Sequence, residues 1–445
     1  MSASSWGDSV PVASTADIAT AAEPHWTLPT RVSFRFLFVY LGLYNIAFLW
    51  QIFASEAALE LWSKYFALWQ RIVQPVAMTV FGVKADVLPN GSGDTTFDYV
   101  LIFVYAVIAA FATLVWSVVD RARPSYPLLY AWLRTYVRFG LALAMIGYGV
   151  AKIIPLQFGT LRLDRLTQPV GDMSPMGMLW TFMSASVLYT MFTGAGELIA
   201  GLLLTARRTA LLGALITAGV MANVAMLNFS YDVPVKLYSS HLLFMALFIA
   251  APDALRLARM FVLNQRVEPA KLRPRFDNPR VDTASRVLRT VFVLAVLVMS
   301  FSQAITMWNE WKREPNEKAP LYGIWTVDAM RVDGVDRPPL TTDKDRWRRF
   351  IVTGKRFAAV DQMDDTRFRY FMTHDEQKKT LTFKQGRDPK RNGTVAYRQP
   401  DASTLIFDGT VGGRKFEATL HKAPMPEFLL TNRGFHWINE YPMNR

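Results

Sequence analysis

Seven strongly apolar runs of about 20 residues alternate with polar connections along most of this chain. An α-helix needs about 20 residues to cross roughly 30 Å of hydrocarbon, and these runs lack the polar face of a core helix in a soluble protein. Each run is therefore predicted to be a transmembrane helix. The runs cover residues 32–54, 98–119, 135–155, 180–205, 209–230, 239–258 and 287–307.

The pattern differs on both sides of these runs. Residues 1–27 are rich in Ser, Ala and Thr, with no basic region followed by an apolar one, which predicts a disordered tail and not a cleaved signal peptide. Short alternating stretches begin near Leu321, with turn residues at Thr353-Gly354, Asn392-Gly393 and Asp408-Gly409. Eight or nine strands with this spacing predict a small antiparallel barrel or sandwich, an all-β domain over residues 319–445.

Two further segments predict local structure. Residues 57–81 carry charges together with Trp62 and Trp69, which favours an amphipathic helix lying on the outer membrane surface. The segment NGSGDTT, residues 90–96, resembles a nest of backbone amides for an anion, but no lysine-bearing helix follows it. Asp94 or Thr95 is therefore predicted to be the N-cap of the second span.

Charge and composition sharpen this picture. The net charge is +13, and the arginines and lysines concentrate in alternate connections, most densely in the basic loop 259–283. By the positive-inside rule, this alternation predicts a cytoplasmic N-terminus and an extracytoplasmic β domain, so the basic excess sets orientation and does not indicate nucleic-acid binding. The chain has no cysteine, which excludes disulfides and thiolate chemistry, and its scattered histidines predict no metal site.

The spans contain ionisable and amide side chains, which are costly in hydrocarbon and mark functional sites by default. Glu197 is expected near the middle of the bilayer, with Lys152 roughly 10 Å nearer the outer surface, so a direct salt bridge would need a tilted helix or a long reach. Asn223 is expected to face a neighbouring helix. Eight residues are predicted to line a polar cup that opens outward: Tyr148, Lys152, Glu197, Asn223, Asn228, Asp232, Lys236 and His241. The alternative is that these side chains pair among themselves and only hold the bundle together.

The residues around Glu197 resemble a known family. RFGLALAMIGYGVAKIIPLQF and the later TGAGELIAGLLLTARR are similar to the DoxX-like group of bacterial four-helix membrane proteins, whose second helix carries an E-x-x-x-G-x-x-L pattern before a basic turn. Glu197, Gly201, Leu204 and Arg207-Arg208 match that pattern. Gly323-x-Trp325 likewise resembles the G-x-W start of lipocalin-type barrels, in which the tryptophan closes one end. A core tryptophan on a first strand is the alternative.

The DoxX-like resemblance implies a multi-pass protein of the bacterial inner membrane, and some such relatives are subunits of quinone-linked oxidoreductases. We therefore expect N-terminal membrane helices in residues 28–130, a DoxX-like four-helix core in 131–258 and a last transmembrane helix in 284–308. The leading hypothesis is a protein that binds a small polar or lipid-like ligand in the cup, covered by the β domain. A quinone-linked component, with a quinone or a membrane partner subunit bound, and a proton-coupled transporter are the alternatives. No motif predicts a particular reaction.

Overall fold

The computed structural model describes residues 25–50, 56–87, 90–269, 278–313, 319–386 and 388–444. The chain forms two compact units. The first comprises residues 1–146, 199–229 and 234–290, and the second comprises residues 147–198, 230–233 and 291–445. Most of the predicted tail, residues 1–24, and part of the basic loop, residues 270–277, lie outside the described residues.

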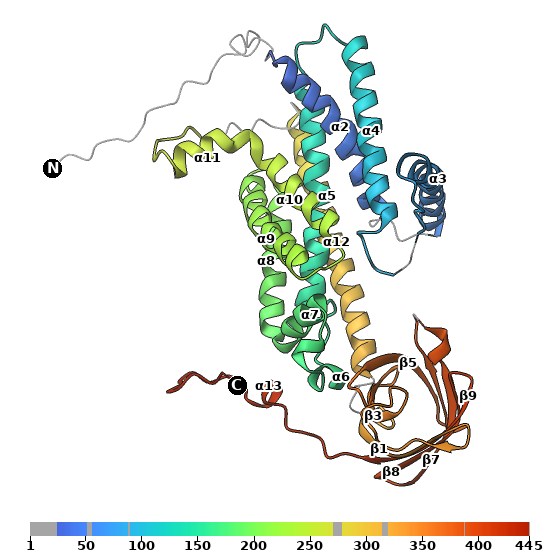
Figure 1. Cartoon of the computed structure of the whole chain (residues 1–445). Coiled ribbons are helices and arrows are strands. Elements are labelled where there is room, and N and C mark those ends of the chain that lie inside the picture. Colours follow the sequence, from blue (N-terminus) through green and yellow to red (C-terminus); the bar gives the residue numbers. More distant parts are fainter. Residues whose placement is uncertain are drawn as a thin grey trace, which may run out of the picture. The chain divides into compact units, whose positions relative to one another are not determined.

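The membrane part of the chain is helical (Figure 1). Its apolar runs contain few helix breakers, and the helices end where the polar connections begin. The longer helices are α2 (Leu28–Trp50), α3 (Glu56–Phe81), α4 (Thr96–Val119), α5 (Pro127–Ile153), α7 (Pro175–Ala185), α8 (Val187–Thr205), α9 (Ala210–Ser230), α10 (Lys236–Ala250), α11 (Ala254–Phe261) and α12 (Pro279–Arg313). Short helical turns lie at α6 (Leu163–Leu166), Val170–Asp172 and Ala251–Asp253.

Six stretches of the described residues are long and apolar enough to cross a membrane, so the chain is a multi-pass membrane protein. They are Thr96–Val119, Pro127–Ile153, Val187–Thr205, Ala210–Ser230, Lys236–Phe261 and Pro279–Lys312. These match six of the seven predicted spans, and α2 corresponds to the first predicted span without being among the six. A seventh crossing therefore stays a prediction.

The predicted fourth span, residues 180–205, is wrong as a single helix. The chain leaves helical geometry at Ser186, where φ is −131° and ψ is 96°, so α7 ends there and α8 begins at the next residue. The Ser186 hydroxyl accepts a hydrogen bond from the backbone N–H of Tyr189 at 3.2 Å, as in a serine cap. An apolar run alone does not reveal such a break, because serine and threonine are also common inside continuous membrane helices.

Polarity in the helices is the reverse of that in a water-soluble protein. Large apolar side chains of α4 are exposed, including Phe111, Leu114 and Val119, whereas Arg35 of α2 is buried. The Arg35 guanidinium donates to the Tyr126 hydroxyl at 2.6 Å and to the Ser117 hydroxyl at 2.8 Å. Exposed apolar surface with satisfied buried charge is the arrangement that a hydrocarbon solvent favours.

The C-terminal strands form a closed antiparallel barrel (Figure 1), which resolves the predicted choice between a barrel and a sandwich. Eight strands follow one another in sequence order, and the last pairs with the first from Trp325↔Lys422 to Val332↔Phe416. They are β1 (Gly323–Val332), β3 (Trp347–Gly354), β4 (Phe357–Gln362), β5 (Arg367–Asp375), β6 (Thr380–Lys384), β7 (Gly393–Asp401), β8 (Thr404–Val411) and β9 (Arg414–Lys422). The two-residue β2 (Val335–Asp336) pairs antiparallel with the end of β1.

Alternation along the strands turns one side chain in two into the barrel. The interior holds a cluster of buried aromatic and aliphatic side chains that includes Trp325, Phe350, Phe383 and Phe407. Trp325 is fully buried, and its indole N–H donates to the carbonyl of Leu321 at 2.8 Å. The tryptophan therefore fills the barrel at the start of β1.

One predicted turn in this domain is wrong. Asp408-Gly409 lies within β8, where Gly409 pairs with Val395 on one side and Phe416 on the other. A Cβ at Gly409 would come within 2.3 Å of the carbonyl oxygen of Thr394. The glycine is therefore required by the close approach of two strands and not by a reversal of the chain.

Candidate functional site

Helices α5 and α8 cross with their backbones in contact, because glycines face each other at the crossing. A Cβ on Gly149 would lie 2.6 Å from the backbone nitrogen of Leu198, and a Cβ on Gly194 would lie 2.6 Å from the Cβ of Lys152. Small residues permit this close packing of membrane helices. The crossing brings the next turn of α5, with Lys152, against the side chain of Glu197 on α8.

Lys152 and Glu197 form a direct ion pair in which the ammonium Nζ donates to Oε1 of the carboxylate. Lys152 is 5% exposed and Glu197 is 1% exposed, so both charges are withdrawn from solvent. The sequence indicated that a direct salt bridge would need a tilted helix or a long reach, and the side chains do meet where α5 and α8 cross closely.

The second oxygen of the carboxylate has a different environment. Glu197 Oε2 is buried and has no hydrogen-bond partner among the described residues. Buried polar atoms are almost always hydrogen-bonded to protein, water or a ligand. Tyr148 lies one helical turn before Lys152 on α5 and is 37% exposed. The Glu197 carboxylate therefore has one oxygen bonded to Lys152 and one without a hydrogen-bond partner among the described residues. The Tyr148 phenol lies one turn of α5 away.

The first turn of α10 is held by a capping interaction that the sequence did not predict. The Asp94 carboxylate accepts hydrogen bonds from the backbone N–H groups of Lys236 at 2.7 Å and Leu237 at 2.9 Å. The Lys236 ammonium lies 3.7 Å from the same carboxylate. Asp94 thus caps α10 from a distant part of the chain. Thr95 is the N-cap of α4, as predicted, in a capping box with Asp98.

His241 is held by aromatic side chains of α2. Its Nδ1 lies 2.7 Å from the carbonyl of Leu237, which can only accept, so Nδ1 carries the proton. In the neutral ring, Nε2 then accepts from the Tyr40 hydroxyl at 2.7 Å. The imidazole also stacks on Tyr44, with ring centroids 4.2 Å apart.

Three other residues of the predicted cup also have defined places. Asn228 is buried and donates to the Ser239 hydroxyl at 3.0 Å. Asp232 is exposed and has a φ of 49° in the turn after α9. Asn223 is exposed, so the prediction that it faces a neighbouring helix is wrong. That prediction rested on Ala210, Ala214, Ala218 and Ala222, which precede Asn223 at intervals of four residues. A repeat of four residues drifts by about 40° per repeat around the helix, so it does not keep one face.

The structure therefore places the eight predicted residues in two units. Tyr148, Lys152, Glu197 and Asp232 belong to one, and the other four belong to the second. Lys152 and Glu197 contact each other directly, and Oε2 of Glu197 is a buried atom without a hydrogen-bond partner among the described residues.

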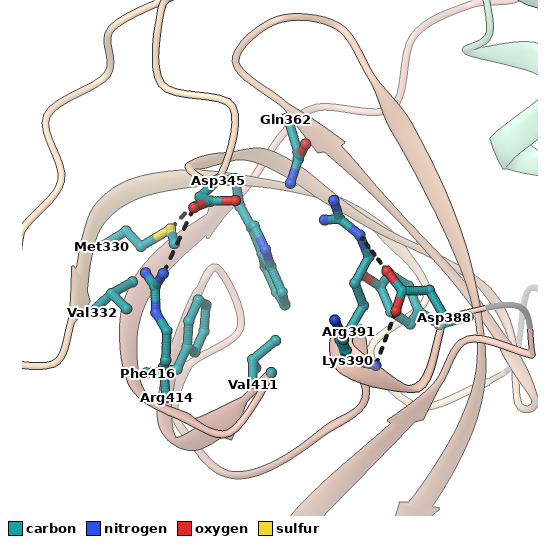
Figure 2. A pocket seen from close by; sticks show the side chains of 13 residues that line it. Met330, Val332, Asp345, Gln362, Asp388, Lys390, Arg391, Val411, Arg414 and Phe416 are labelled. Atoms are coloured by element: carbon teal, nitrogen blue, oxygen red, sulfur yellow. Dashed lines mark hydrogen bonds and ion pairs between the residues drawn. The ribbon is translucent and has the colours of Figure 1, made fainter.

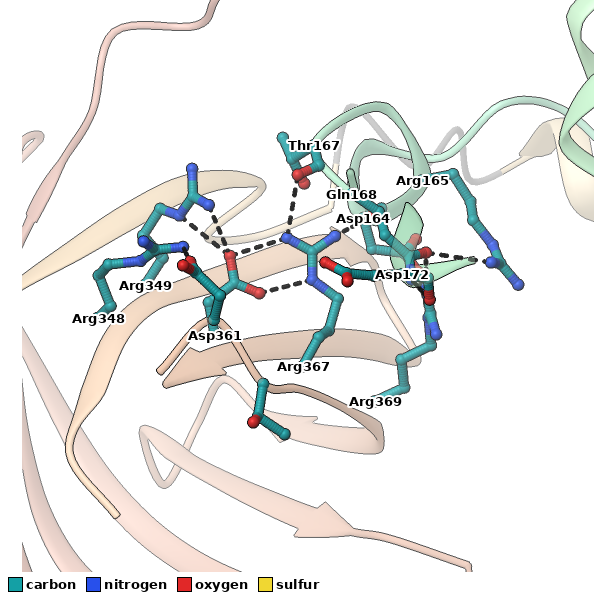
Figure 3. Close-up of polar contacts among 12 residues, drawn as sticks. Asp164, Arg165, Thr167, Gln168, Asp172, Arg348, Arg349, Asp361, Arg367 and Arg369 are labelled. Atoms are coloured by element: carbon teal, nitrogen blue, oxygen red, sulfur yellow. Dashed lines mark hydrogen bonds and ion pairs between the residues drawn. The ribbon is translucent and has the colours of Figure 1, made fainter. Parts of the chain in front are cut away.

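A second polar cluster, missed from the sequence, joins the segment 162–168 to the outside of the barrel (Figure 3). Asp164 is 1% exposed, and its carboxylate accepts from Arg162 at 3.1 and 3.2 Å and from Arg369 at 2.7 Å. Arg367 donates to the backbone carbonyl of Asp164 and binds Asp361 at 2.5 and 2.8 Å. Arginine forks and carboxylates thus fix the barrel strands to this loop.

The charge balance keeps Asp164 ionised. Burial alone would raise the pKa of the Asp164 carboxyl, but the guanidinium groups of Arg162 and Arg369 outweigh burial and hold the pKa below its usual value. The sequence contained a partial signal, since Arg367 and Arg369 are two apart on one strand and must share a face. Nothing in it identified the loop that this face contacts.

No protein-family model matches the chain, and no solved structure matches it. The chain is similar to a protein of Bacillus subtilis (strain 168), the uncharacterized protein YwoB. The identity is 33% over 126 residues, which cover 28% of this chain and 79% of YwoB.

Proposed function

We propose that this chain, which belongs to the family of the uncharacterized Bacillus subtilis protein YwoB, is a DoxX-like integral membrane protein that binds a small polar or lipid-like ligand at Lys152 and Glu197. The membrane is the bacterial inner membrane, and the barrel lies on its extracytoplasmic side. The observation that carries the proposal is the buried Oε2 of Glu197, which lacks a hydrogen-bond partner among the described residues.

The chemistry of the pair supports this function. A carboxylate withdrawn from water requires compensation on both oxygens, and Lys152 supplies it on only one. A ligand hydroxyl or amide N–H that donates to Oε2 would complete the site. Tyr148, which is partly exposed one turn away, would meet the same ligand from α5.

A purely structural pair is the competing explanation, and a double variant separates the two. Replacement of a buried ion pair by apolar side chains of similar size is often neutral or stabilising, whereas removal of one partner costs about 3–5 kcal/mol. Lys152→Met with Glu197→Met should therefore fold under either explanation. If the pair binds a ligand, the double variant folds but carries none.

The experiment is mass spectrometry of small molecules and lipids that remain with the purified protein. The wild type, the double variant and Thr217→Val would be compared in the same detergent. Thr217 is a suitable control because it is a buried polar residue whose hydroxyl already donates to Gly213 at 2.8 Å. We expect one species in near-stoichiometric amounts with the wild type and the control, and its loss from the double variant. A wild type that retains nothing, or equal retention by all three proteins, would refute the proposal.

A further inference from the structure

The barrel contains a cavity of about 300 Å³. Its lining includes Met330 and Val332 at the end of β1 and Phe416, which pairs with Val332 on β9. Trp325 fills the barrel at the start of β1, seven residues before Val332 and therefore roughly 20 Å away along the strand. The cavity thus lies at the end opposite to the one that Trp325 closes.

Part of the cavity wall is formed by apolar and aromatic side chains. Trp347 and Phe416 pack against each other with ring centroids 4.6 Å apart, and Val411 lies beside them at the end of β8. Figure 2 shows Val411 and Phe416 below the cavity and Gln362 above it. Aromatic walls of this kind favour a ligand with a flat aromatic body, and a volume near the lower limit for ligand pockets favours a small one.

Two residues of the lining, Gln362 and Tyr370, bring polar groups to the cavity. Gln362 is 4% exposed and Tyr370 is 5% exposed, and neither the side-chain amide nor the phenol makes a hydrogen bond within the described part of the chain. Burial raises the pKa of Tyr370 to about 12, so its hydroxyl remains a donor at neutral pH. The polar atoms of both side chains are open to the cavity, where a bound molecule could hydrogen-bond with them.

The rim of the cavity carries charged side chains, and its two arginines are held in ion pairs. Arg414 lies 3.4 Å from Asp333 and 3.7 Å from Asp345, and Arg391 lies 3.4 Å from Asp388. Lys390 also lines the rim, and its ammonium has no acidic group within ion-pair distance in the described residues. Figure 2 shows Lys390 and Arg391 together on one side of the opening.

We propose that the open end of the barrel binds a small aromatic carboxylate that carries a second polar oxygen. The ring lies against Trp347 and Phe416, the carboxylate meets Lys390, and the second oxygen hydrogen-bonds with Gln362 and Tyr370. Each contact follows from a group that lines the cavity, and the site does not depend on the function proposed for Lys152 and Glu197.

The probe for this site is 6-hydroxy-2-naphthoate, titrated calorimetrically into the full chain in lipid nanodiscs, with empty nanodiscs as the blank. Two matched probes separate the contacts: 2-naphthoate lacks the hydroxyl, and 2-naphthol lacks the carboxylate. We expect saturable binding of the hydroxy acid and weaker binding of both others. Absence of saturable binding, or equal affinity for all three compounds, would overturn the proposal.

Matched variants test the residues. Lys390→Gln should weaken binding of the hydroxy acid about fivefold and leave 2-naphthol unchanged, because a rim ion pair contributes up to about that factor. Lys384→Gln removes the same charge from an exposed site that does not line the cavity, and binding should be unchanged. Equal effects of the two substitutions would refute the assignment of Lys390.

Two substitutions inside the cavity complete the test. Val411→Trp should fill the space and abolish binding, while Gln362→Met should weaken the hydroxy acid about fivefold and leave 2-naphthoate unchanged. Gln362→Met keeps the volume nearly constant, so it still decides the question if Val411→Trp prevents folding. Binding that survives in a folded Val411→Trp variant, or that Gln362→Met leaves unaltered, would place the ligand elsewhere.

Discussion

Asp164 stabilises the folded chain as a carboxylate, because its pKa is held below the ordinary value of 3.8 against the effect of burial. The arginines that do this come from two sides, Arg162 from its own segment and Arg369 from strand β5. A group whose folded pKa is depressed contributes its full stability above the unfolded pKa and loses it as the pH falls through the folded pKa. The contribution of Asp164 is therefore present at neutral pH and declines below about pH 4.

Asp164→Asn should lower the free energy of unfolding by about 1–3 kcal/mol at pH 7, since it leaves charged guanidinium groups with a neutral partner. The variant and the wild type should converge as the pH falls below 4. Thermal unfolding followed by tryptophan fluorescence between pH 7 and pH 3 measures both effects. Asp172→Asn, an exposed acid in the helical turn that follows this segment, is the control and should leave stability unchanged. A constant difference across the whole pH range would contradict the role of ionised Asp164.

For single residues, the sequence indicated which side chains were important better than it indicated which residues they contact. It singled out Lys152 and Glu197 as costly intramembrane charges, and the structure joins them directly. Lys236 was also singled out, but its contact with Asp94 was not, because the two residues are 142 positions apart. Polarity in an apolar run is visible locally, whereas the partner depends on how distant helices pack.

Glycines at the crossing of α5 and α8 set the geometry of the ion pair. Gly149 has no room for a side chain, whereas a Cβ on Gly147, on the same helix, would meet nothing within 4 Å. These two positions form a matched pair for substitution. Both glycines lie on α5 in the same membrane environment, and they differ in how much space is available for a side chain.

Gly149→Val should therefore destabilise the chain by about 1–3 kcal/mol, because its side chain would push the two backbones apart. Gly147→Ala should be neutral or slightly stabilising, since alanine has the higher helix propensity. Melting temperatures of the detergent-purified proteins measure the difference. If Gly149→Val melts with the wild type, the close crossing of α5 and α8 is not the contact that holds Lys152 against Glu197.

The cap of α10 makes a separate prediction. Asp94→Ala removes the acceptor for two backbone N–H groups at the start of that helix and should cost about 1 kcal/mol. Asp86→Ala changes an exposed acid in the same connection and should cost little. Chemical denaturation compared across the two variants gives the difference. Equal stability of the two would show that Asp94 does not cap α10.

The sequence predicted which segments form helices and which form strands, but it did not predict every point at which these elements begin, end or are interrupted. Apolar length predicted the helices, and alternation predicted the strands, because burial imposes both periods on the sequence. The break at Ser186 and the position of Gly409 within β8 depend on contacts that no local pattern contains. The closure of the sheet into a barrel is likewise a property of the β1–β9 pairing, which joins the two ends of the domain.

The chain as a whole joins membrane helices to a barrel that has its own closed sheet and aromatic core. The basic residues in alternate connections predict that the barrel lies outside the cytoplasm. Because the chain contains no cysteine, one introduced thiol reports on a single position without background from the protein. That absence makes the predicted topology directly testable.

Lys384→Cys places a thiol on the exposed surface of the barrel, and Arg259→Cys places one near the end of α11, in the predicted cytoplasmic connection. A membrane-impermeant maleimide added to intact spheroplasts should label the first position and leave the second unlabelled until the membrane is permeabilised. Both substitutions are at exposed residues, so each variant should reach the membrane in wild-type amounts. The reverse labelling pattern would place the barrel in the cytoplasm and would remove the basis for an outward-facing ligand site. Labelling of both positions in intact spheroplasts would mean that the span between them does not cross, because an odd number of crossings must separate the two sites.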